Sequence, residues 1–290
     1  MVISHTADGT GARMGLGMAR VERVRALITV KAAPEPSRTY IDTVCVAGVR
    51  LDRDVSEWIR LYPVPFRHLS TSQQFAKYDI IEVDTIAAKS DSRVESRRPI
   101  WDSLEVVDRL DQKAARDRAL GSLARTTMCE LIDGVKAHPD AQSLGLVDVR
   151  QLHGFKLSKH PGWSKDQQRA IHGAMDQLAL FDAPERTVQP LQPPRFIVKI
   201  HYECAAVPCN AHQPSLLDFE LSALQHRGRF STDDELAALI QRKFRDEQFG
   251  EAFRTSLFVG NIADPPKRRS FSALGIHHVP RDSDWTTTLF

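Results

Sequence analysis

Two histidines and two cysteines lie within twelve positions of one another, in a spacing that suits a metal ion: His201, Cys204, Cys209 and His212. Tetrahedral zinc accepts thiolates and imidazoles, and a short proline-containing loop lets Cys209 and His212 fold back toward Cys204. In a continuous strand His201 and Cys204 point to opposite faces, so a four-ligand site requires the strand to end near Tyr202. We therefore expect zinc on Cys204, Cys209 and His212, with His201 as the fourth candidate. Two reduced, partly buried thiols are the alternative.

A second group alternates aromatic rings with guanidinium groups, which suits single-stranded nucleic acid: Trp58, Arg60, Tyr62, Phe66 and Arg67. If the segment begins as a strand, Trp58, Arg60 and Tyr62 share one face and the aliphatic residues between them enter the core. Aromatic rings stack on bases and arginine binds phosphate, and this combination binds single strands with little sequence specificity. The alternative is that the rings are buried and Arg60 pairs with a carboxylate such as Glu82.

Residues 150–169 form a basic stretch with interleaved rings. Five Lys or Arg residues against one Asp leave a charge of +4 over these twenty residues. Phosphates favour such a mixture, because each neutralised charge releases a counterion while the rings add stacking. Lys156, Lys159 and Trp163 are therefore candidate nucleic-acid contacts. A solvated loop or lid would have the same composition.

Carboxylates beside the Cys/His cluster raise the alternative of a metal-dependent nuclease. Asp218 and Glu220 diverge by about 200° on a helix, so a two-carboxylate site needs help from Glu203 or His212. The sequence has no nucleophile elbow, phosphate-binding P-loop, dinucleotide glycine fingerprint or metalloprotease histidine pair. No catalytic residue is assigned.

The order of predicted elements indicates an α+β chain. Runs of β-branched residues at roughly ten-residue spacing from Val24 onward predict a small antiparallel barrel or sandwich. Helical spacing between Asp108 and Ala137 predicts one or two inserted helices. The segment 183–195 holds four prolines and can bury little, which predicts a linker. The expected division is a tail at 1–20, a β-rich region with helices at 21–182, that linker, and a C-terminal α+β domain at 196–290.

Composition is that of a globular protein. The 290 residues are 42% hydrophobic and 26% charged, which excludes the disordered, collagenous and membrane classes. A net charge of +2 does not indicate nucleic-acid binding, so that function must rest on local patches. No long apolar run is present, and we expect a cytoplasmic protein without membrane contact. Cys45 and Cys129 have apolar neighbours and are interpreted as core residues.

Several segments together resemble the dual-OB-domain proteins encoded in bacteria and their mobile elements. The segments are VKAAPEPSRTYIDTVCVAGV, WIRLYPVPFRHL, FAKYDIIEVD, DSRVESRR and the C-terminal pattern C-x4-C-x2-H…DFE…LFVGN…LG. The resemblance implies a pair of small OB-type barrels, a fold often used for single strands or nucleotides, in proteins linked to defence against foreign DNA. Ala211 and Gln213 stand where we expect a glycine and an acid around the cluster histidine, which weakens a catalytic interpretation there.

The resemblance also implies a binding surface and an accessory metal-binding knuckle. The surface comprises Trp58, Arg60, Tyr62, Phe66, Arg67, Arg93 and Arg97, and the knuckle comprises Cys204, Cys209 and His212. The 21–182 region then becomes an OB-like β-barrel region with a helical insert. Fold alone does not settle function.

The leading hypothesis is a module that binds single-stranded or locally opened nucleic acid through the ring–guanidinium row and the basic loops. A metal-dependent nuclease is the first alternative. The second is a non-enzymatic assembly or sensor subunit that binds proteins encoded by neighbouring genes. Aromatic and arginine side chains also dominate protein interfaces, so composition does not separate a protein partner from nucleic acid.

Overall fold

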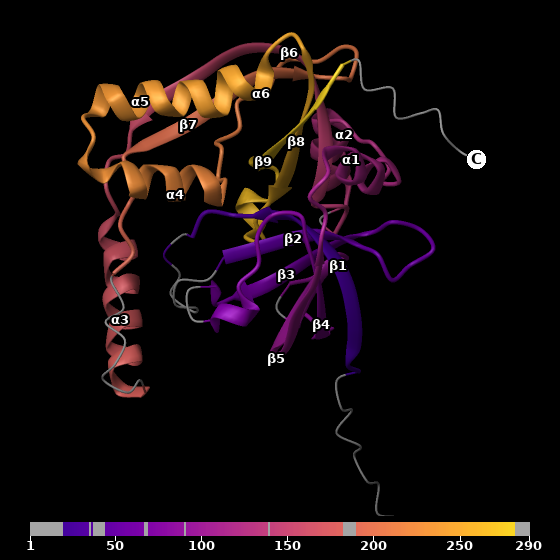
Figure 1. Ribbon diagram of the computed structural model, residues 1–290, viewed down its shortest axis with the longest axis vertical. Coiled ribbons are helices and arrows are strands. Elements are labelled where there is room, and N and C mark those ends of the chain that lie inside the picture. Colours follow the sequence, from indigo (N-terminus) through magenta and orange to yellow (C-terminus); the bar gives the residue numbers. More distant parts are fainter. Residues whose placement is uncertain are drawn as a thin grey trace, which may run out of the picture.

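The computed structural model describes residues 20–34, 36, 44–66, 69–89, 91–138, 140–181 and 190–281. Two β units are joined by helices, and Figure 1 shows the first in indigo to magenta beneath the second. The α+β class predicted from the sequence is confirmed. The expected tail at 1–20 lies outside the described residues except for Arg20, and Arg67 also lies outside them.

The first unit is a closed barrel of five strands. They are β1 (Glu22–Lys31), β2 (Val44–Arg50), β3 (Trp58–Val64), β4 (Asp79–Ala87) and β5 (Ser96–Arg109). The order is β1-β2-β3-β5-β4, with β4 returning to β1, and β3 with β5 is the parallel pair. Closure leaves no unpaired sheet edge. This is the OB-like barrel that the sequence predicted.

Helices α1 (Lys113–Gly121) and α2 (Met128–Ala137) follow the barrel. The Thr127 hydroxyl accepts the N–H of Glu130, and the Glu130 carboxylate accepts the N–H of Thr127, so a capping box begins α2. Met128, Leu131 and Val135 lie three and four residues apart and are buried, so they fix one face of α2 against the second unit. Glu130 lies in the first turn of α2, and its negative charge interacts favourably with the positive N-terminal end of the helix dipole.

The second unit is an antiparallel sheet in the order β7-β6-β8-β9. Its strands are β6 (Leu144–Lys159), β7 (Phe196–Cys204), β8 (Phe253–Asn261) and β9 (Phe271–Pro280). Residues 212–217 run between its two outer strands. The N–H of Leu216 donates to Val198 of β7 at 2.8 Å, and that of Leu217 donates to Ala273 of β9 at 2.7 Å. The bridge at β7 is antiparallel and that at β9 is parallel, so the second unit repeats the pairing order of the first.

Further helices surround the second unit. They are α3 (Lys165–Phe181), α4 (Phe219–Arg227), α5 (Asp233–Gln241) and α6 (Glu247–Phe249), with a π-helical turn at Arg242–Asp246. Figure 1 shows α3 extending away from the sheet. Within the described ranges, no helix combines the length and the apolar character that a membrane crossing requires.

The Pro-rich segment 183–195 does not separate the two units. Strands β6 and β7 lie on either side of it and pair from Lys159 with Phe196 onward, so both belong to one sheet. The change of unit falls between β5 and β6 instead, where α1 and α2 lie. A proline-rich composition shows that a segment buries little, but it does not show which strands pair across it. Only residues 190–195 of this segment are described.

An apolar cluster joins the two units. On the barrel side it includes Ala47 and Val49, which point out of the barrel, whereas Val44 and Val46 of the same strand point into it. On the other side the cluster is completed by Leu144, Leu146, Phe258 and Leu274. OB folds hold oligonucleotides on the face of their second and third strands. In the first barrel, the second unit covers the outward side chains of β2.

Candidate metal centre and interdomain pocket

Three cysteines and one histidine converge where α2 meets the end of β7: Cys129, Cys204, Cys209 and His212. The sulfur atoms are 3.6, 3.7 and 3.9 Å apart, and His212 Nε2 is 3.4, 3.5 and 3.6 Å from them. Tetrahedral bonds of about 2.3 Å to sulfur and about 2.05 Å to nitrogen require edges of about 3.8 and about 3.5 Å. All six edges agree within about 0.2 Å, so the cluster is compatible with a tetrahedral metal site.

Backbone pairing fixes three of the four side chains. Tyr202 and His212 exchange two backbone hydrogen bonds of 3.0 and 2.8 Å, which close the loop between them. Cys204 is the last residue of β7 and is fully buried, and Cys209 lies on the loop. Cys129 reaches the cluster from the first turn of α2.

The structure replaces one predicted ligand. Strand β7 continues to Cys204, so His201 lies on the opposite face and its ring packs against that of His153 with centroids 5.1 Å apart. Cys129 completes the cluster and is not the simple core residue that its apolar neighbours indicated. It lies 75 residues before Cys204, so only tertiary packing brings the two together. Cys204, Cys209 and His212 do lie together.

The environment shifts the pKa values of the cluster in different directions. Burial opposes a lower pKa for Cys204, but hydrogen bonds from the backbone of Cys129 and Ala206 lower the pKa of this thiol. Burial and the neighbouring thiol groups of Cys204 and Cys209 raise the pKa of Cys129 to about 12. Burial also lowers the pKa of His212, which keeps its imidazole neutral at pH 7. A neutral imidazole is the form that ligates metals.

The rings of the predicted nucleic-acid row pack between the two units. Trp58 is half-buried and meets Phe258 of β8 edge-to-face, with centroids 6.3 Å apart. Phe66 meets Phe219 of α4 in the same manner at 5.5 Å. Tyr62 is half-buried. Two of the rings that were expected to stack on bases, Trp58 and Phe66, therefore pack edge-to-face against the second unit of the same chain.

The guanidinium groups of that row are also engaged within the chain. Arg60 is 2% exposed and donates to the hydroxyl and carbonyl oxygens of Ser143 at 3.0 and 3.3 Å. Arg93 donates to the carbonyl of Asn261 at 2.6 Å and pairs with Asp91. Sequence alternation correctly places Trp58 and Arg60 away from the barrel core, but the covering surface is protein. The outward-facing row is thus corrected to an interdomain contact.

The remaining predicted contacts do not form a ring platform. Arg97 donates to the carbonyl oxygens of Val94 and Ser96. Lys156 is exposed on β6, and Lys159 forms an ion pair with Asp233 at 2.6 Å. The indole N–H of Trp163 donates to the carbonyl of Leu191, and this ring is half-buried.

The carboxylates proposed for a nuclease are not brought together as metal ligands. Asp218 begins α4 and accepts the N–H groups of Glu220 and Leu221. Glu203 pairs instead with Arg150 and His153 on β6. Among the residues that the structure describes, the one group of potential ligands is the Cys/His cluster.

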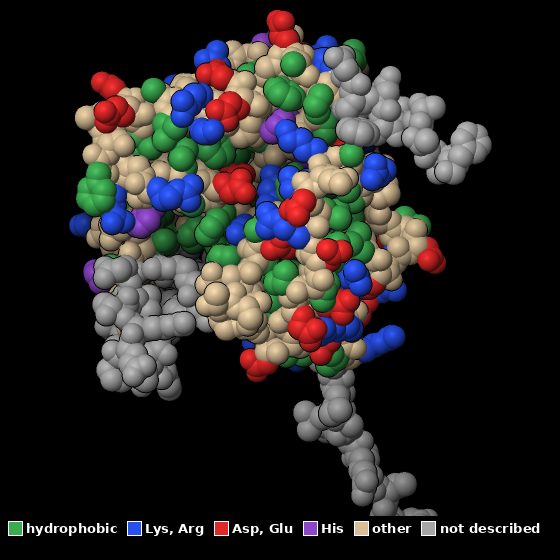
Figure 2. All heavy atoms as spheres, viewed as in Figure 1, with side chains coloured by type: hydrophobic (Ala, Val, Ile, Leu, Met, Phe, Trp, Pro, Cys, Tyr) green, Lys and Arg blue, Asp and Glu red, His purple; other side chains and the backbone are tan. Residues whose placement is uncertain are grey.

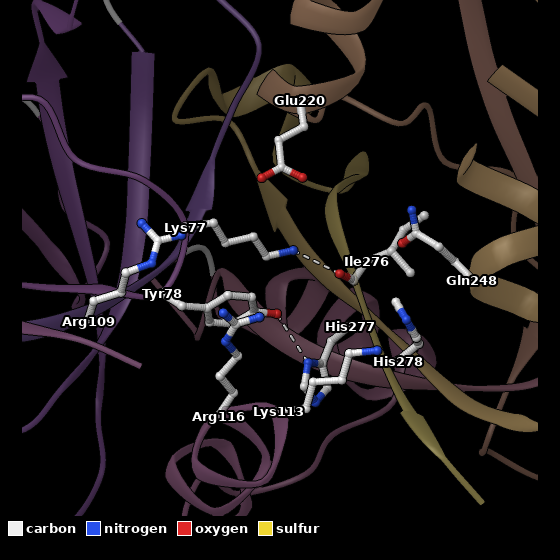
Figure 3. A pocket seen from close by; sticks show the side chains of 10 residues that line it. All are labelled: Lys77, Tyr78, Arg109, Lys113, Arg116, Glu220, Gln248, Ile276, His277 and His278. Atoms are coloured by element: carbon white, nitrogen blue, oxygen red, sulfur yellow. Dashed lines mark hydrogen bonds between the residues drawn. The ribbon is translucent and has the colours of Figure 1, made fainter. Parts of the chain in front are cut away.

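A basic pocket with a volume of about 260 Å³ lies between the units, and we call it the interdomain pocket. Its lining comprises Lys77, Tyr78, Arg109, Lys113, Arg116, Glu220, Gln248, Ile276, His277 and His278. Four Lys or Arg side chains therefore face one carboxylate, and all four cations come from the barrel and α1. Figure 3 shows Lys77 pointing to Ile276 of β9, Lys113 beside His278 and Arg116 against the ring of Tyr78, with the carboxylate of Glu220 on the opposite side of the pocket. Figure 2 shows Lys and Arg side chains gathered in the middle of this face, where the units meet.

Three of these cations, Lys77, Lys113 and Arg116, form no ion pair with a carboxylate of the described residues, and the Lys77 ammonium donates to the carbonyl of Ile276. The fourth, Arg109, pairs with Asp79 and Asp111. Arg116 lies over the ring of Tyr78, 4.3 Å from its centroid. Of the pocket residues, only Glu220 was considered as a site residue, as one carboxylate of the nuclease alternative. Lys113 and Arg116 lie three residues apart on α1, which is the sequence signal for a basic helix face.

Tyr78 occupies a special place in the pocket. Its backbone has a φ of 72°, in the left-handed region that a bulky residue rarely adopts. Its hydroxyl lies 3.2 Å from His277 Nδ1, and His277 Nε2 lies 3.4 Å from the carboxylate of Asp117. Burial lowers the pKa of His277, although its contact with Asp117 opposes that shift. Burial also lowers the pKa of His278 to about 4, so both imidazoles are neutral at pH 7.

Family models match both parts of the chain. Residues 124–290, more than half of the chain, match the model described as Domain of unknown function (DUF8757). Residues 22–122 match the model described as Domain of unknown function (DUF8758). The two ranges meet between α1 and α2, where the fold changes from the barrel to the second unit, and the interdomain pocket draws residues from both. No curated protein matches the chain.

Proposed function

The chain belongs to the family described as Domain of unknown function (DUF8757), and from its own geometry we propose that it binds single-stranded nucleic acid through the interdomain pocket. The ligand's phosphates would enter the pocket, and its strand would continue along the joint between the units. The ring–guanidinium row of β3 has no part in this proposal, because its members hold the two units together.

The observation that carries the proposal is the excess of cations in a concave site. Lys113 and Arg116 have no carboxylate partner among the described residues, and Lys77 and Arg109 line the same space. Unpaired cations that converge in a pocket attract phosphate, because the binding of each phosphate releases counterions. The guanidinium group of Arg116, which lies over the ring of Tyr78, offers a planar group on which a base can stack. The OB-like barrel supports the proposal as a fold that often takes single strands.

Repeated pairing order in the two units supports a second part of this proposal. Residues 212–217 occupy in the second unit the place that β3 occupies in the first, antiparallel to one neighbour and parallel to the other. Helices α4 to α6 are inserted after this segment. We propose on this ground that the chain is a dual-OB protein in which the first barrel's binding face is covered and the joint has become the ligand site.

Oligonucleotide binding tests the proposal directly. We expect labelled single-stranded DNA or RNA to bind at low salt, measured by fluorescence anisotropy, with an affinity that falls steeply as salt rises. Lys113→Glu and Arg116→Glu should each weaken binding and lower the slope of log affinity against log salt by about one per cation. Lys243→Glu is the matched control, because Lys243 is an exposed lysine of the π-helical turn outside the pocket.

Two outcomes would contradict the proposal. If the wild-type protein does not bind single strands at low salt, the function is wrong. If Lys156→Glu and Lys159→Glu weaken binding while the two pocket variants do not, then the outer edge of β6 is the interface. Lys156 is exposed there and lies directly opposite Lys199 of β7. The two positive charges repel each other, and a bound phosphate would reduce that repulsion.

We also infer that the Cys/His cluster holds a structural zinc ion. Three thiolates and one imidazole form a closed donor set that leaves no position for substrate, which is typical of structural zinc sites. Cys129 on α2 and the three donors of residues 204–212 would then be joined by the metal. The zinc would fix α2 to the end of β7, in place of a hydrophobic contact alone.

Metal analysis tests the zinc site. We expect one zinc per chain by inductively coupled plasma mass spectrometry, and loss of that zinc in Cys129→Ser and Cys209→Ser. Cys45→Ser should retain the metal, because Cys45 lies outside the cluster and contacts Arg60. A full zinc content in Cys129→Ser, or no metal in the wild-type protein purified without chelators, would contradict the assignment.

A further inference from the structure

We propose that Tyr78 is a catalytic nucleophile that takes up a phosphoryl group from a nucleic-acid phosphodiester bound in the interdomain pocket. The proposal rests on the proposed function, because the strand must first enter that pocket. It goes beyond binding by assigning a covalent step to residues that no sequence motif indicated. It does not involve the Cys/His cluster.

The first observation is a relay of three side chains from three elements. The Tyr78 hydroxyl is within hydrogen-bond distance of His277 Nδ1, and His277 Nε2 faces Asp117. A carboxylate that accepts the Nε2–H leaves Nδ1 as the proton acceptor for the phenol. A nucleophile beside a base that a third group orients is the general signature of nucleophilic catalysis. Figure 3 shows the hydroxyl pointing at the imidazole on the pocket wall.

The second observation is the backbone of Tyr78. A non-glycine residue with a large side chain at a φ of 72° is energetically costly, and such residues cluster at functional sites. This conformation turns the Tyr78 ring from the start of β4 toward α1, where Arg116 lies over it. The neighbouring Lys77 donates to the carbonyl of Ile276, so the same turn holds a cation beside the hydroxyl.

The third observation is the set of cations that would receive the phosphate. Lys113 and Arg116 have no carboxylate partner among the described residues, and Lys77 lines the same pocket. Cations of this kind stabilise the charge that develops on the equatorial oxygens during phosphoryl transfer. Together with the relay, they supply a nucleophile, a base and electrostatic stabilisation within one pocket.

The step balances within these residues. The Tyr78 oxygen attacks phosphorus and forms a phosphotyrosyl bond, and its proton passes to His277 Nδ1. The opposite bond, from phosphorus to a ribose or deoxyribose oxygen, breaks. The departing oxygen takes a proton from the Lys113 ammonium and becomes a free hydroxyl end. No oxidant, reductant or metal is consumed.

Covalent trapping tests the step. Wild-type protein is incubated with single-stranded oligonucleotides that carry a bridging phosphorothiolate, on the 5′ side in one probe and on the 3′ side in another. The thiolate leaves without needing a proton and does not attack in reverse, so an adduct accumulates. We expect a labelled protein band on a denaturing gel with one of the probes, and a modified peptide containing Tyr78 by mass spectrometry.

Variants separate chemistry from binding. Tyr78→Phe keeps the ring beneath Arg116 and should lose the adduct by at least about 100-fold while anisotropy still reports binding. His277→Gln should slow adduct formation with the phosphorothiolate probe, because the phenol proton then lacks its acceptor. Tyr202→Phe is the matched control, because the Tyr202 hydroxyl is buried in the core of the second unit and has no hydrogen-bond partner among the residues that the structure describes.

Each result decides between the two proposals. Binding by the wild-type protein without any adduct from either probe overturns the catalytic role of Tyr78 and leaves the binding function intact. An adduct that persists in Tyr78→Phe assigns the nucleophile elsewhere and also overturns it. Absence of binding in anisotropy removes the proposed function and this step together.

Discussion

Arg60 joins the two units through a chain of hydrogen bonds. Its guanidinium donates to the Ser143 hydroxyl, and that hydroxyl donates to Glu95 at 2.6 Å. Both charged groups are almost completely buried, and one nitrogen of Arg60 and one oxygen of Glu95 have no hydrogen-bond partner within the described part of the chain. Their charges therefore compensate each other through one serine. Removing either charge leaves the other buried alone.

Arg60→Met tests this arrangement. The substitution keeps an apolar chain in the joint and leaves Glu95 without compensation, so we expect a loss of about 3–5 kcal/mol in the free energy of unfolding. Urea denaturation followed by circular dichroism measures it. Arg97→Met is the control and should change stability by less than about 0.5 kcal/mol, because Arg97 is partly exposed. Equal effects of the two substitutions would contradict a buried charge network.

Asp218 gives stability a pH dependence of known sign. Burial raises its pKa to about 6, although the charge of Lys77 opposes the shift. Because the folded state holds this proton more tightly than the unfolded chain, its contribution is present at low pH and is lost as pH rises through about 6.

Asp218→Asn isolates that contribution. Asparagine still caps α4, so the helix start is retained. Between pH 5 and pH 7 the wild-type protein should lose about 1.4 kcal/mol of unfolding free energy relative to the variant. Parallel urea titrations at the two pH values measure the difference. A stability gap that does not change with pH would show that Asp218 ionises as an ordinary surface carboxylate does.

At the scale of elements, the start of α2 positions one residue of the proposed zinc site. The capping box holds the first turn, and that turn carries Cys129. Thr127→Ala should cost about 1 kcal/mol and should speed the release of zinc to a coloured chelator, because the first turn then frays. Thr232→Ala removes the same type of cap from α5, which bears no ligand, and should cost stability without changing zinc release. If Thr127→Ala and the wild-type protein release zinc at the same rate, the capping box does not contribute to holding the metal.

The positions of the strands and helices were largely predictable from the sequence, but the contacts between the two units were not. β-branched periodicity locates β1 to β4, and helical spacing locates α1 and α2, since both patterns are local. Cys204, Cys209 and His212 were also found, because one loop holds them. Cys129 and the pocket residues come together only through tertiary contacts, and such contacts produce no regular spacing in the sequence by which these sites could be predicted. The prediction that the Trp58 ring is free to bind nucleic acid was wrong for the same reason. A side chain that points away from the barrel core can pack against the second unit, and the sequence does not distinguish this from exposure to solvent.

At the scale of the molecule, the two units share a pairing order without a visible sequence repeat. Backbone hydrogen bonds define this order, and many side-chain patterns satisfy it, so the repeat appears in the topology alone. The shared joint has two regions with different composition. The apolar cluster around Phe258 consists of buried aliphatic and aromatic side chains, whereas the interdomain pocket is polar and cationic. One region holds the units together, and the other is the proposed ligand site.

The extent of the joint predicts one cooperative unfolding transition. Trp58 packs against Phe258, so its fluorescence reports on the joint in a variant whose other three tryptophans are replaced by phenylalanine, and far-ultraviolet circular dichroism reports on all elements. Thermal curves of circular dichroism and tryptophan fluorescence should coincide, since neither unit can expose its share of the apolar cluster independently. A fluorescence change that precedes the loss of secondary structure would show that the units separate first.

The spacing of the four metal donors sets an order of events during synthesis. One donor is at position 129 and the other three lie between 204 and 212. A ribosome therefore finishes the whole barrel and both linking helices well before an ion has a complete binding set. If the proposed zinc is bound, its capture is therefore a late step that only a chain extended beyond His212 can undergo.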